Sequence, residues 1–231
     1  MMIESVTDAG SLARLYSEIL EPSFPPTELI GRDDFVGAAA SGELDVLAAR
    51  DGDDHLGAIV GERHGAAFLV GWLAVGGARR GGGTGSALIA AGIARWLAQP
   101  GVVLVLAEVE RPDVFVAHPR YGDPARRLAF YERLGTTLLD LPYYQAPIGE
   151  GLPRVRNLLL TVLAARNPAS PPRLLDPDEV AAVRAMLLGT IGPARPGDAE
   201  TARVHAVADD PSGLRLLPLA DYARVPLLIE P

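Results

Sequence analysis

The feature that most constrains this chain is a glycine-rich turn, Val75 to Leu88, set between two apolar segments. It joins an apolar run at 66–75 to an apolar periodic run at 87–97, and this order predicts a strand, a turn and a helix. Glycines in such a turn let the backbone approach a ligand closely, because no side chain intervenes. The following helix points free N–H groups and the positive end of its dipole at the turn, and Arg80 adds a charge beside them. The sequence therefore predicts a cradle for a pyrophosphate.

Two common phosphate-binding motifs do not fit this turn. A P-loop requires a lysine at the phosphates, and the chain contains no lysine. A dinucleotide-binding turn requires Gly-x-Gly-x-x-Gly, but the sixth position is Ser86 when counted from Gly81 and Leu88 when counted from Gly83. The pattern that remains is Arg80-x-x-Gly83-x-Gly85.

This remaining pattern, with its flanking valine and leucine, resembles the acetyl-CoA pyrophosphate loop of the GNAT-type N-acetyltransferases. The usual pattern of that family is Val-x-Pro-x-x-Arg-Gly-x-Gly-x-Gly-x-x-Leu, and every position matches except the proline, which is Gly77 here. The resemblance implies acetyl-CoA as cosubstrate, with its pyrophosphate on the turn and its pantetheine arm along the main chain of the preceding strand. Backbone N–H groups there could also polarise the thioester carbonyl, as an oxyanion hole does. The cofactor-binding residues implied are Leu73, Ala74, Val75, Arg80, Gly81, Gly82, Gly83, Thr84, Gly85 and Ser86.

Apolar periodicity and turn residues predict an α/β (α+β) chain with a mixed central β-sheet flanked by helices, which is also the fold that the resemblance implies. The strands expected are 45–50, 55–63, 66–75, 102–110, 136–143 and 156–164. The helices expected are 11–19, 33–40 with a cap at Asp33 or Asp34, 87–98, 123–134 and one beginning at Asp176.

The chain divides at about residue 165. Residues 1–165 are expected to form the acetyltransferase domain, and 166–231 a C-terminal extension with a linker at 168–172, one helix and an irregular, proline-rich tail from 192 onward. The tail could pack against the catalytic body or against a partner subunit, as in a homodimer. Alternatively, it could form a lid over the acceptor site.

Acetyl transfer to an amine needs a group that accepts the amine proton and one that protonates the departing thiolate. The segment 127–135, Arg-Leu-Ala-Phe-Tyr-Glu-Arg-Leu-Gly, resembles the family helix that ends in Tyr-Glu-Lys-x-Gly-Phe, and this implies Tyr131 as the acid. A phenol of pKa about 10 can protonate a thiolate of pKa about 8.5 without being ionised at rest. Pro124 and Thr136 depart from the asparagine and phenylalanine usual in that segment.

The motif does not assign the base. Some family members carry a glutamate six residues before the valine of the turn, but that position is Leu69 here. Glu108 and Glu110 lie two residues apart on an expected strand, so they face the same side. In this fold that strand splays from its neighbour where the thioester enters. Either carboxylate could accept the amine proton through a water, or it could instead be paired with an arginine.

Several other side chains are candidates for the acceptor region. Histidine side chains can act as bases near neutral pH, so His118 is a further candidate for the base, although a loop histidine before proline is more often structural. Candidates for lining the acceptor pocket are Phe24, Glu28, Arg120, Tyr121, Tyr143 and Tyr144.

Composition restricts the classes of partner. The net charge of −8, with no arginine stripe among interleaved aromatics, argues against nucleic acid and favours a cationic partner such as an amine acceptor. The absence of cysteine excludes disulfides, thiolate metal sites and a cysteine acyl-enzyme, and the four histidines lack ligand spacing, so no metal is expected. There is no apolar run of spanning length and no signal core, so no membrane partner and a cytoplasmic location are expected.

The sequence thus predicts an N-acetyltransferase that transfers the acetyl group of acetyl-CoA to a small-molecule or peptide amine by direct attack in a ternary complex. A non-catalytic acyl-CoA-binding sensor or partner subunit is the alternative, and a donor with a longer acyl chain is a third interpretation. The glycine-rich loop is expected to contact the pyrophosphate and not the acyl group or the acceptor, so it does not distinguish these interpretations.

Overall fold

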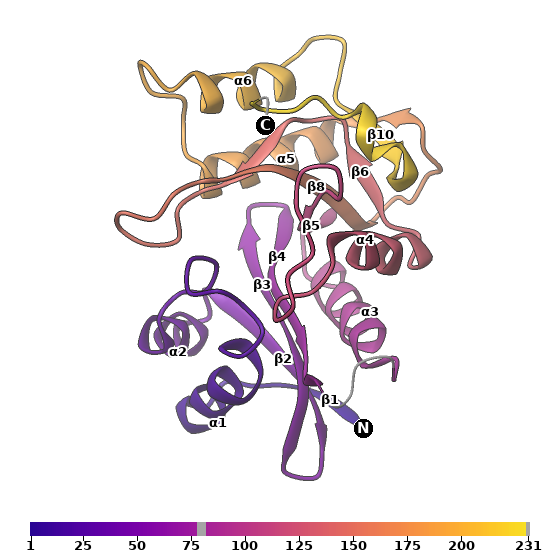
Figure 1. Ribbon diagram of the computed structural model, residues 1–231. Coiled ribbons are helices and arrows are strands. Elements are labelled where there is room, and N and C mark those ends of the chain that lie inside the picture. The colour runs from indigo at the N-terminus through magenta and orange to yellow at the C-terminus, as the bar shows by residue number, and fades with distance from the viewer. Residues whose placement is uncertain (78–81, 230–231) are drawn as a thin grey trace.

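The computed structural model describes residues 1–77 and 82–229, and it shows one mixed sheet with helices on both faces (Figure 1). The strand order is β1-β2-β3-β4-β5-β8-β6-β10-β9, and β7 pairs with β8 beside this path. The strands are β1 (Met2–Ser5), β2 (Leu44–Asp51), β3 (Asp54–His64), β4 (Ala67–Val75), β5 (Leu104–Glu110), β6 (Thr137–Leu139), β7 (Tyr143–Gln145), β8 (Val155–Ala165), β9 (Arg173–Leu174) and β10 (Arg215–Pro218). The predicted α/β sheet is confirmed.

The helices lie in two layers. The α-helices are α1 (Ala9–Leu15), α2 (Arg32–Ser41), α3 (Thr84–Leu97), α4 (Pro124–Arg133), α5 (Pro177–Thr190) and α6 (Ala199–Ala208). Helix α1 continues as the wider helical turn η1 (Tyr16–Leu20), and a short 3-10 helix, η3 (Leu219–Arg224), follows β10. Helices α3 and α4 share a core with one face of the sheet, whereas α1 and α2, and α5 and α6, cover the other face in two further clusters. No helix in the described part of the chain is long and apolar enough to cross a membrane.

Two glycines of β3 let α3 lie close to the sheet. A Cβ at Gly57 would stand 3.1 Å from the Leu88 side chain of α3, and one at Gly61 would stand 2.5 Å from the Trp96 ring. The Trp96 indole N–H also donates to Asp45 at 3.0 Å, which fixes the far end of α3 against β2. Close packing at these positions therefore sets where the N-terminus of α3 meets the end of β4.

Two local predictions were wrong. Helix α2 begins at Gly31 as its N-cap, so Asp33 and Asp34 fall inside its first turn, where a negative charge still favours the helix dipole. The expected strand 136–143 is split into β6 and β7 because Pro142 lacks an N–H for the ladder and breaks the run.

The C-terminal extension continues the sheet and packs against it. Strand β10 pairs antiparallel with β6 through Leu216↔Leu139 and carries β9 on its other side. Helix α5 begins at Asp176 as predicted, with a complete capping box to Glu179. The tail after residue 192 was expected to be irregular, but it forms α6, β10 and η3, and its apolar residues join the two main cores. Short elements between Pro and Gly residues gave too little periodicity to be recognised.

Candidate active site

The site is a cleft formed where β4 and β5 part. These two strands form a parallel pair from Ala67↔Leu104 to Val70↔Ala107, and there the pairing stops. Strand β4 nevertheless continues to Val75 and β5 to Glu110. A bulge that leaves Gly71 unpaired on β4 lies at the same point, and bulges bend a strand locally. The splayed strands thus expose the edge of β4 to a cavity of about 1150 Å³, and Leu73, Ala74 and Val75 line it.

The N-terminus of α3 opens into this cavity. Gly83 is the N-cap residue at φ 80°, a conformation that favours glycine, and no side chain among the described residues caps the helix. The first N–H groups of a helix have no partner within the helix, and they carry the positive end of its dipole. Thr84, Gly85 and Ser86 bring these groups to the wall of the cavity. The arrangement suits an anion, which the pyrophosphate of CoA would supply.

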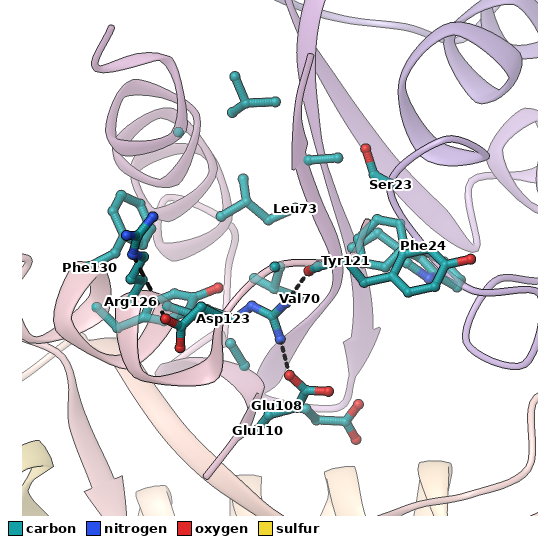
Figure 2. A pocket seen from close by; sticks show the side chains of 18 of the residues that line it. Ser23, Phe24, Val70, Leu73, Glu108, Glu110, Tyr121, Asp123, Arg126 and Phe130 are labelled. Carbon is teal, nitrogen blue, oxygen red and sulfur yellow. Dashed lines mark hydrogen bonds and ion pairs between the residues drawn. The ribbon is translucent and has the colours of Figure 1, made fainter. Parts of the chain in front are cut away.

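Helix α4 forms the wall beside this N-terminus. A Cβ at Gly85 would stand 3.4 Å from the Phe130 ring, so the two helices are in contact at the cavity. Figure 2 shows Phe130 and Arg126 together on this side, with Leu73 and Val70 of β4 across from them. Arg126 and Arg133 both line the cavity and add positive charge to the wall on which we expect the phosphates.

Tyr131 of α4 lines the cavity from the face of the sheet that α3 and α4 cover. Its side chain is buried in their shared core, and burial raises the pKa of its hydroxyl to about 12. The phenol therefore stays protonated across the physiological range. No hydrogen bond engages this hydroxyl within the described chain, so its proton is available to a group in the cavity.

Glu108 of β5 reaches the same cavity from the opposite face, because it alternates in phase with Leu104 and Leu106 of the cluster that α5 covers. The Tyr143 hydroxyl donates to Glu108 Oε1 at 2.7 Å. Burial is the main effect on this carboxyl and raises its pKa to about 7, although hydrogen bonds from Tyr143 and Gln145 oppose it. A carboxylate with a pKa near neutrality is suited to accept and release a proton.

Glu110 lines the same cavity, but its carboxylate is engaged in an ion pair. Arg127 Nη1 of α4 donates to Glu110 Oε2 at 2.6 Å, and Arg127 Nη2 donates to the Tyr121 carbonyl at 2.9 Å (Figure 2). The sequence left open whether either carboxylate is paired with an arginine. The structure pairs Glu110 and leaves Glu108 without a basic side chain in contact in the described chain.

The segment between η1 and α2 closes the cavity on the side opposite α4. The Trp72 indole N–H donates to the Glu28 carbonyl at 2.8 Å, and the Tyr16 hydroxyl donates to the Ile30 carbonyl at 2.8 Å. These bonds hold Phe24 and Glu28 at the wall, as expected for residues that shape an acceptor pocket. Burial, and then the charge of Glu110, raise the pKa of the Glu28 carboxyl.

The loop after β5 forms the mouth of the cavity. His118 Nδ1 accepts from the backbone N–H groups of Arg120 at 3.2 Å and Tyr121 at 3.3 Å, and its ring stacks on Tyr121. Because one ring nitrogen is committed to this turn, we assign His118 to shaping the loop. His118 and Tyr121 line the cavity, whereas the described lining does not include Arg120.

Solved structures match this chain, whereas no family model and no curated sequence does. A solved structure from Bacteroides thetaiotaomicron, assigned to the GNAT family of acetyltransferases, matches with a TM-score of 0.59 over 81% of this chain and 96% of its own, at 24% identity. The fold is that of the GNAT acetyltransferases. A second solved structure, assigned as an acetyltransferase from Acinetobacter baylyi, matches with a TM-score of 0.51 over 74% of this chain and 97% of its own, at 16% identity.

Within this GNAT fold, the structure brings most of the predicted site residues together. Arg80 and Gly81 lie outside the described residues, and Gly82 is exposed and does not line the cavity. Leu69 is buried in the cluster that α5 and α6 cover, and it does not line the cavity. The other predicted cofactor and catalytic positions line one cavity, namely Leu73, Ala74, Val75, Gly83, Thr84, Gly85, Ser86, Glu108, Glu110 and Tyr131.

The prediction that Tyr143 and Tyr144 line the acceptor pocket was wrong. Both are fully buried behind the wall, where Tyr143 contacts Glu108 and Tyr144 contacts the Thr201 hydroxyl. Strand alternation does not predict that both side chains are buried, because the pairing of β7 with β8 shifts in register between Tyr143 and Tyr144. The cavity is also lined by Arg126 and Arg133, which the sequence analysis did not single out, although the helix expected at 123–134 is visibly rich in arginine.

Proposed function

We propose that this protein is an N-acetyltransferase that transfers the acetyl group of acetyl-CoA to an amine by direct attack in a ternary complex. The observation that carries the proposal is one cavity in which the free edge of β4, the uncapped N-terminus of α3, Tyr131 and Glu108 meet. A strand edge, an anion site, an acid and a base are the four groups that this reaction requires.

Acetyl-CoA would bind on the side of the cavity that α3 and α4 form. Thr84, Gly85 and Ser86 present backbone N–H groups to its pyrophosphate, and the edge of β4 at 73–75 presents hydrogen-bonding groups to its pantetheine amides. The wall contains aromatic and apolar contacts from Phe130 and Leu73.

The proton movements can be assigned to two residues on opposite faces of the sheet. Bound acetyl-CoA supplies an activated acetyl group, whose C–S bond breaks as the N–C bond forms. Glu108 accepts one proton from the acceptor ammonium group and passes it to solvent, which frees the nitrogen lone pair, and it accepts a second proton from the same nitrogen as the N–C bond forms, directly or through a water. Tyr131 donates the proton that the departing sulfur gains. Exchange with solvent then restores the carboxylate and the phenol, so that no net proton remains on the protein.

The acceptor we propose is an amine that enters as a cation from the side of Phe24 and Glu28. Three carboxylates, Glu28, Glu108 and Glu110, face this end of the cavity, and Arg127 neutralises one of them. Opposite charge within a few ångströms of a desolvated carboxylate favours its ionised form. A cationic small molecule, or a peptide with a free N-terminus, therefore complements this end better than a neutral or acidic acceptor.

The test is thermal unfolding followed by an acceptor screen. At about 100 times a dissociation constant, a ligand that binds only the folded state adds about 2.7 kcal/mol of stability, which raises Tm by several degrees. We expect that rise with acetyl-CoA and with CoA but not with ATP or NAD. Thiol release with one of a panel of monoamines, diamines, amino acids and peptides would then establish transfer. Binding without release for any amine would favour the sensor, and no shift with either CoA species would overturn the proposal.

A further inference from the structure

The C-terminal extension is attached to the acceptor end of the cleft by polar side chains. Asn157 of β8 is buried with φ 60°, and its amide oxygen accepts from the N–H groups of Leu228 at 2.8 Å and Ile229 at 3.3 Å. Arg111, the residue after β5, is also buried and donates to the Val225 carbonyl at 3.0 Å. Both side chains lie on elements that also supply residues to the cleft, so the extension is joined directly to its wall.

Helices α5 and α6 make a second attachment, through β7 and the start of β8. The Tyr144 hydroxyl is hydrogen-bonded to the Thr201 hydroxyl of α6. Arg154 lies over the Tyr144 ring at 4.4 Å and donates to Asp198 at 2.8 Å and to Glu200 at 3.0 Å. These contacts fix β7 and its neighbour against the extension.

Tyr143 connects this framework to the site. Its side chain is fully buried in the cluster that includes Met186 and Leu187 of α5, and its hydroxyl donates to Glu108 Oε1 at 2.7 Å. At the end of α5, the Thr190 hydroxyl donates to the Met186 carbonyl at 3.0 Å. Burial and the adjacent carboxylate raise the pKa of Tyr143 well above its usual value, so this hydroxyl always has a proton to donate.

We propose that Tyr143, held by α5 of the C-terminal extension, is the positioning residue for Glu108, so that the extension is a working part of the transfer site. Tyr143 holds one carboxylate oxygen and leaves the other directed to the acceptor. It also favours the ionised form, because a hydroxyl can donate to a carboxylate but gains less from a protonated carboxyl. This inference rests on the proposed function only for the role of Glu108 as base. The contact itself does not depend on that role.

The other groups around Glu108 do not replace this contact. Glu28 acts through its charge and raises the pKa of Glu108, and His64 acts through its charge in the opposite direction. Gln145 donates a neutral hydrogen bond from β7. The nearby cation, Arg127, is engaged with Glu110. Tyr143 is therefore the one side chain in the described surroundings that both fixes Glu108 at a hydrogen-bonding distance and links it to the extension.

The neighbouring tyrosines allow a matched experiment. Tyr143→Phe and Tyr144→Phe each remove one buried hydroxyl from adjacent residues, but only the first loses a contact with Glu108. The measurement is the pH titration of the Glu108 carboxyl by ¹³C NMR, with the signal assigned by its loss in Glu108→Gln. We expect the titration midpoint to rise by about one pH unit in Tyr143→Phe, as a lost hydrogen bond to a charged group predicts. We expect the midpoint to stay in place in Tyr144→Phe.

The outcomes separate this inference from the proposed function, because the titration needs no activity. An unchanged midpoint in Tyr143→Phe, or an equal rise in Tyr144→Phe, would overturn the positioning role. If the midpoint rises in Tyr143→Phe while the acid limb of acetyl transfer does not follow it, the positioning role stands and Glu108 is not the base. A Tm close to that of Tyr144→Phe serves as the check that Tyr143→Phe is folded.

Discussion

Arg127 of α4 and Glu110 of β5 form an ion pair of 2.6 Å across the mouth of the cleft, only two residues from the unpaired Glu108. Both glutamates face the same cavity, so strand alternation alone does not distinguish them. The ion pair distinguishes them, because Arg127 binds a carboxylate oxygen of Glu110, whereas no basic side chain of the described chain contacts Glu108. Glu110 thus fixes α4 against β5, and Glu108 is left for the proton transfer that we propose.

This difference predicts unequal effects of two matched substitutions. Glu108→Gln should lower kcat by about 10²-fold or more, since it removes the proton acceptor. Glu110→Gln should reduce kcat less than about tenfold, because it weakens an ion pair that is partly open to solvent. Steady-state kinetics with the acceptor at saturation measures both effects. Equal losses in the two variants, with acetyl-CoA affinity unchanged, would contradict the assignment of the base.

The pH dependence of kcat should have an acid limb with a midpoint of about 7. Glu108 must be ionised to accept a proton, so the rate falls as the pH drops through this value and reaches a plateau above it. A limb centred near pH 4.5, the ordinary value for glutamate, would show that the carboxyl is not desolvated when the acceptor is bound. The limb should be absent from the residual activity of Glu108→Gln.

The raised pKa of Glu108 also predicts an effect on the stability of the fold. The folded-state pKa of Glu108, about 7, lies above the value of 4.5 for the exposed group, so the folded state binds the proton more tightly. The contribution of Glu108 to stability therefore falls as the pH rises from about 4.5 to 7 and stays low above that. Glu108→Gln should raise Tm by several degrees at pH 8 but not at pH 4.5. Scanning calorimetry at both pH values checks the sign, and Glu132→Gln on the exposed face of α4 is the control.

Local patterns made the strands and the glycine turn predictable, because β4 is almost wholly apolar and Gly83 needs a positive φ. The contact between Tyr143 and Glu108 was not predictable, since it joins residues 35 apart and depends on a register shift between β7 and β8. The conformation and contacts of Asn157 were not predictable for the same reason. Its αL conformation and its bonds to residues 71 and 72 positions away follow from the packing of the extension, and no local signal marks them.

Tyr131→Phe should lower kcat by about 10²-fold while leaving the affinity for acetyl-CoA unchanged, because only the proton donor is removed. The buried hydroxyl has a pKa of about 12, so the wild type should show no loss of rate from its ionisation up to pH 10. Isothermal titration with acetyl-CoA and a pH series of kcat test the two parts. A thiol-independent assay of the acetylated product excludes uncoupled hydrolysis as the source of residual thiol release.

Charge at Gly83 should abolish binding of acetyl-CoA. Gly83→Asp places a carboxylate at the N-terminus of α3, where we expect the pyrophosphate, whereas Gly83→Asn adds a side chain of the same size without charge. Asparagine and aspartate both tolerate a φ of 80°, and no atom of the described residues lies within 4 Å of the new Cβ, so both variants should fold. Titration calorimetry should show a far larger loss of affinity for Asp than for Asn. Similar losses in the two variants would indicate that the cradle is not electrostatic.

A second positive charge on the acceptor should improve kcat/KM. Glu28 has no cationic partner in contact in the described structure. Burial, and then repulsion from Glu110, raise its pKa, so an ammonium group near it would offset both effects. We expect 1,4-diaminobutane to exceed 1-aminobutane by about tenfold, and 4-aminobutanoate to be the poorest of the three. Glu28→Gln should remove most of the preference for the diamine and leave the rate with the monoamine nearly unchanged. Equal kcat/KM values for all three amines in the wild type would mean that the acceptor is selected by shape rather than by charge.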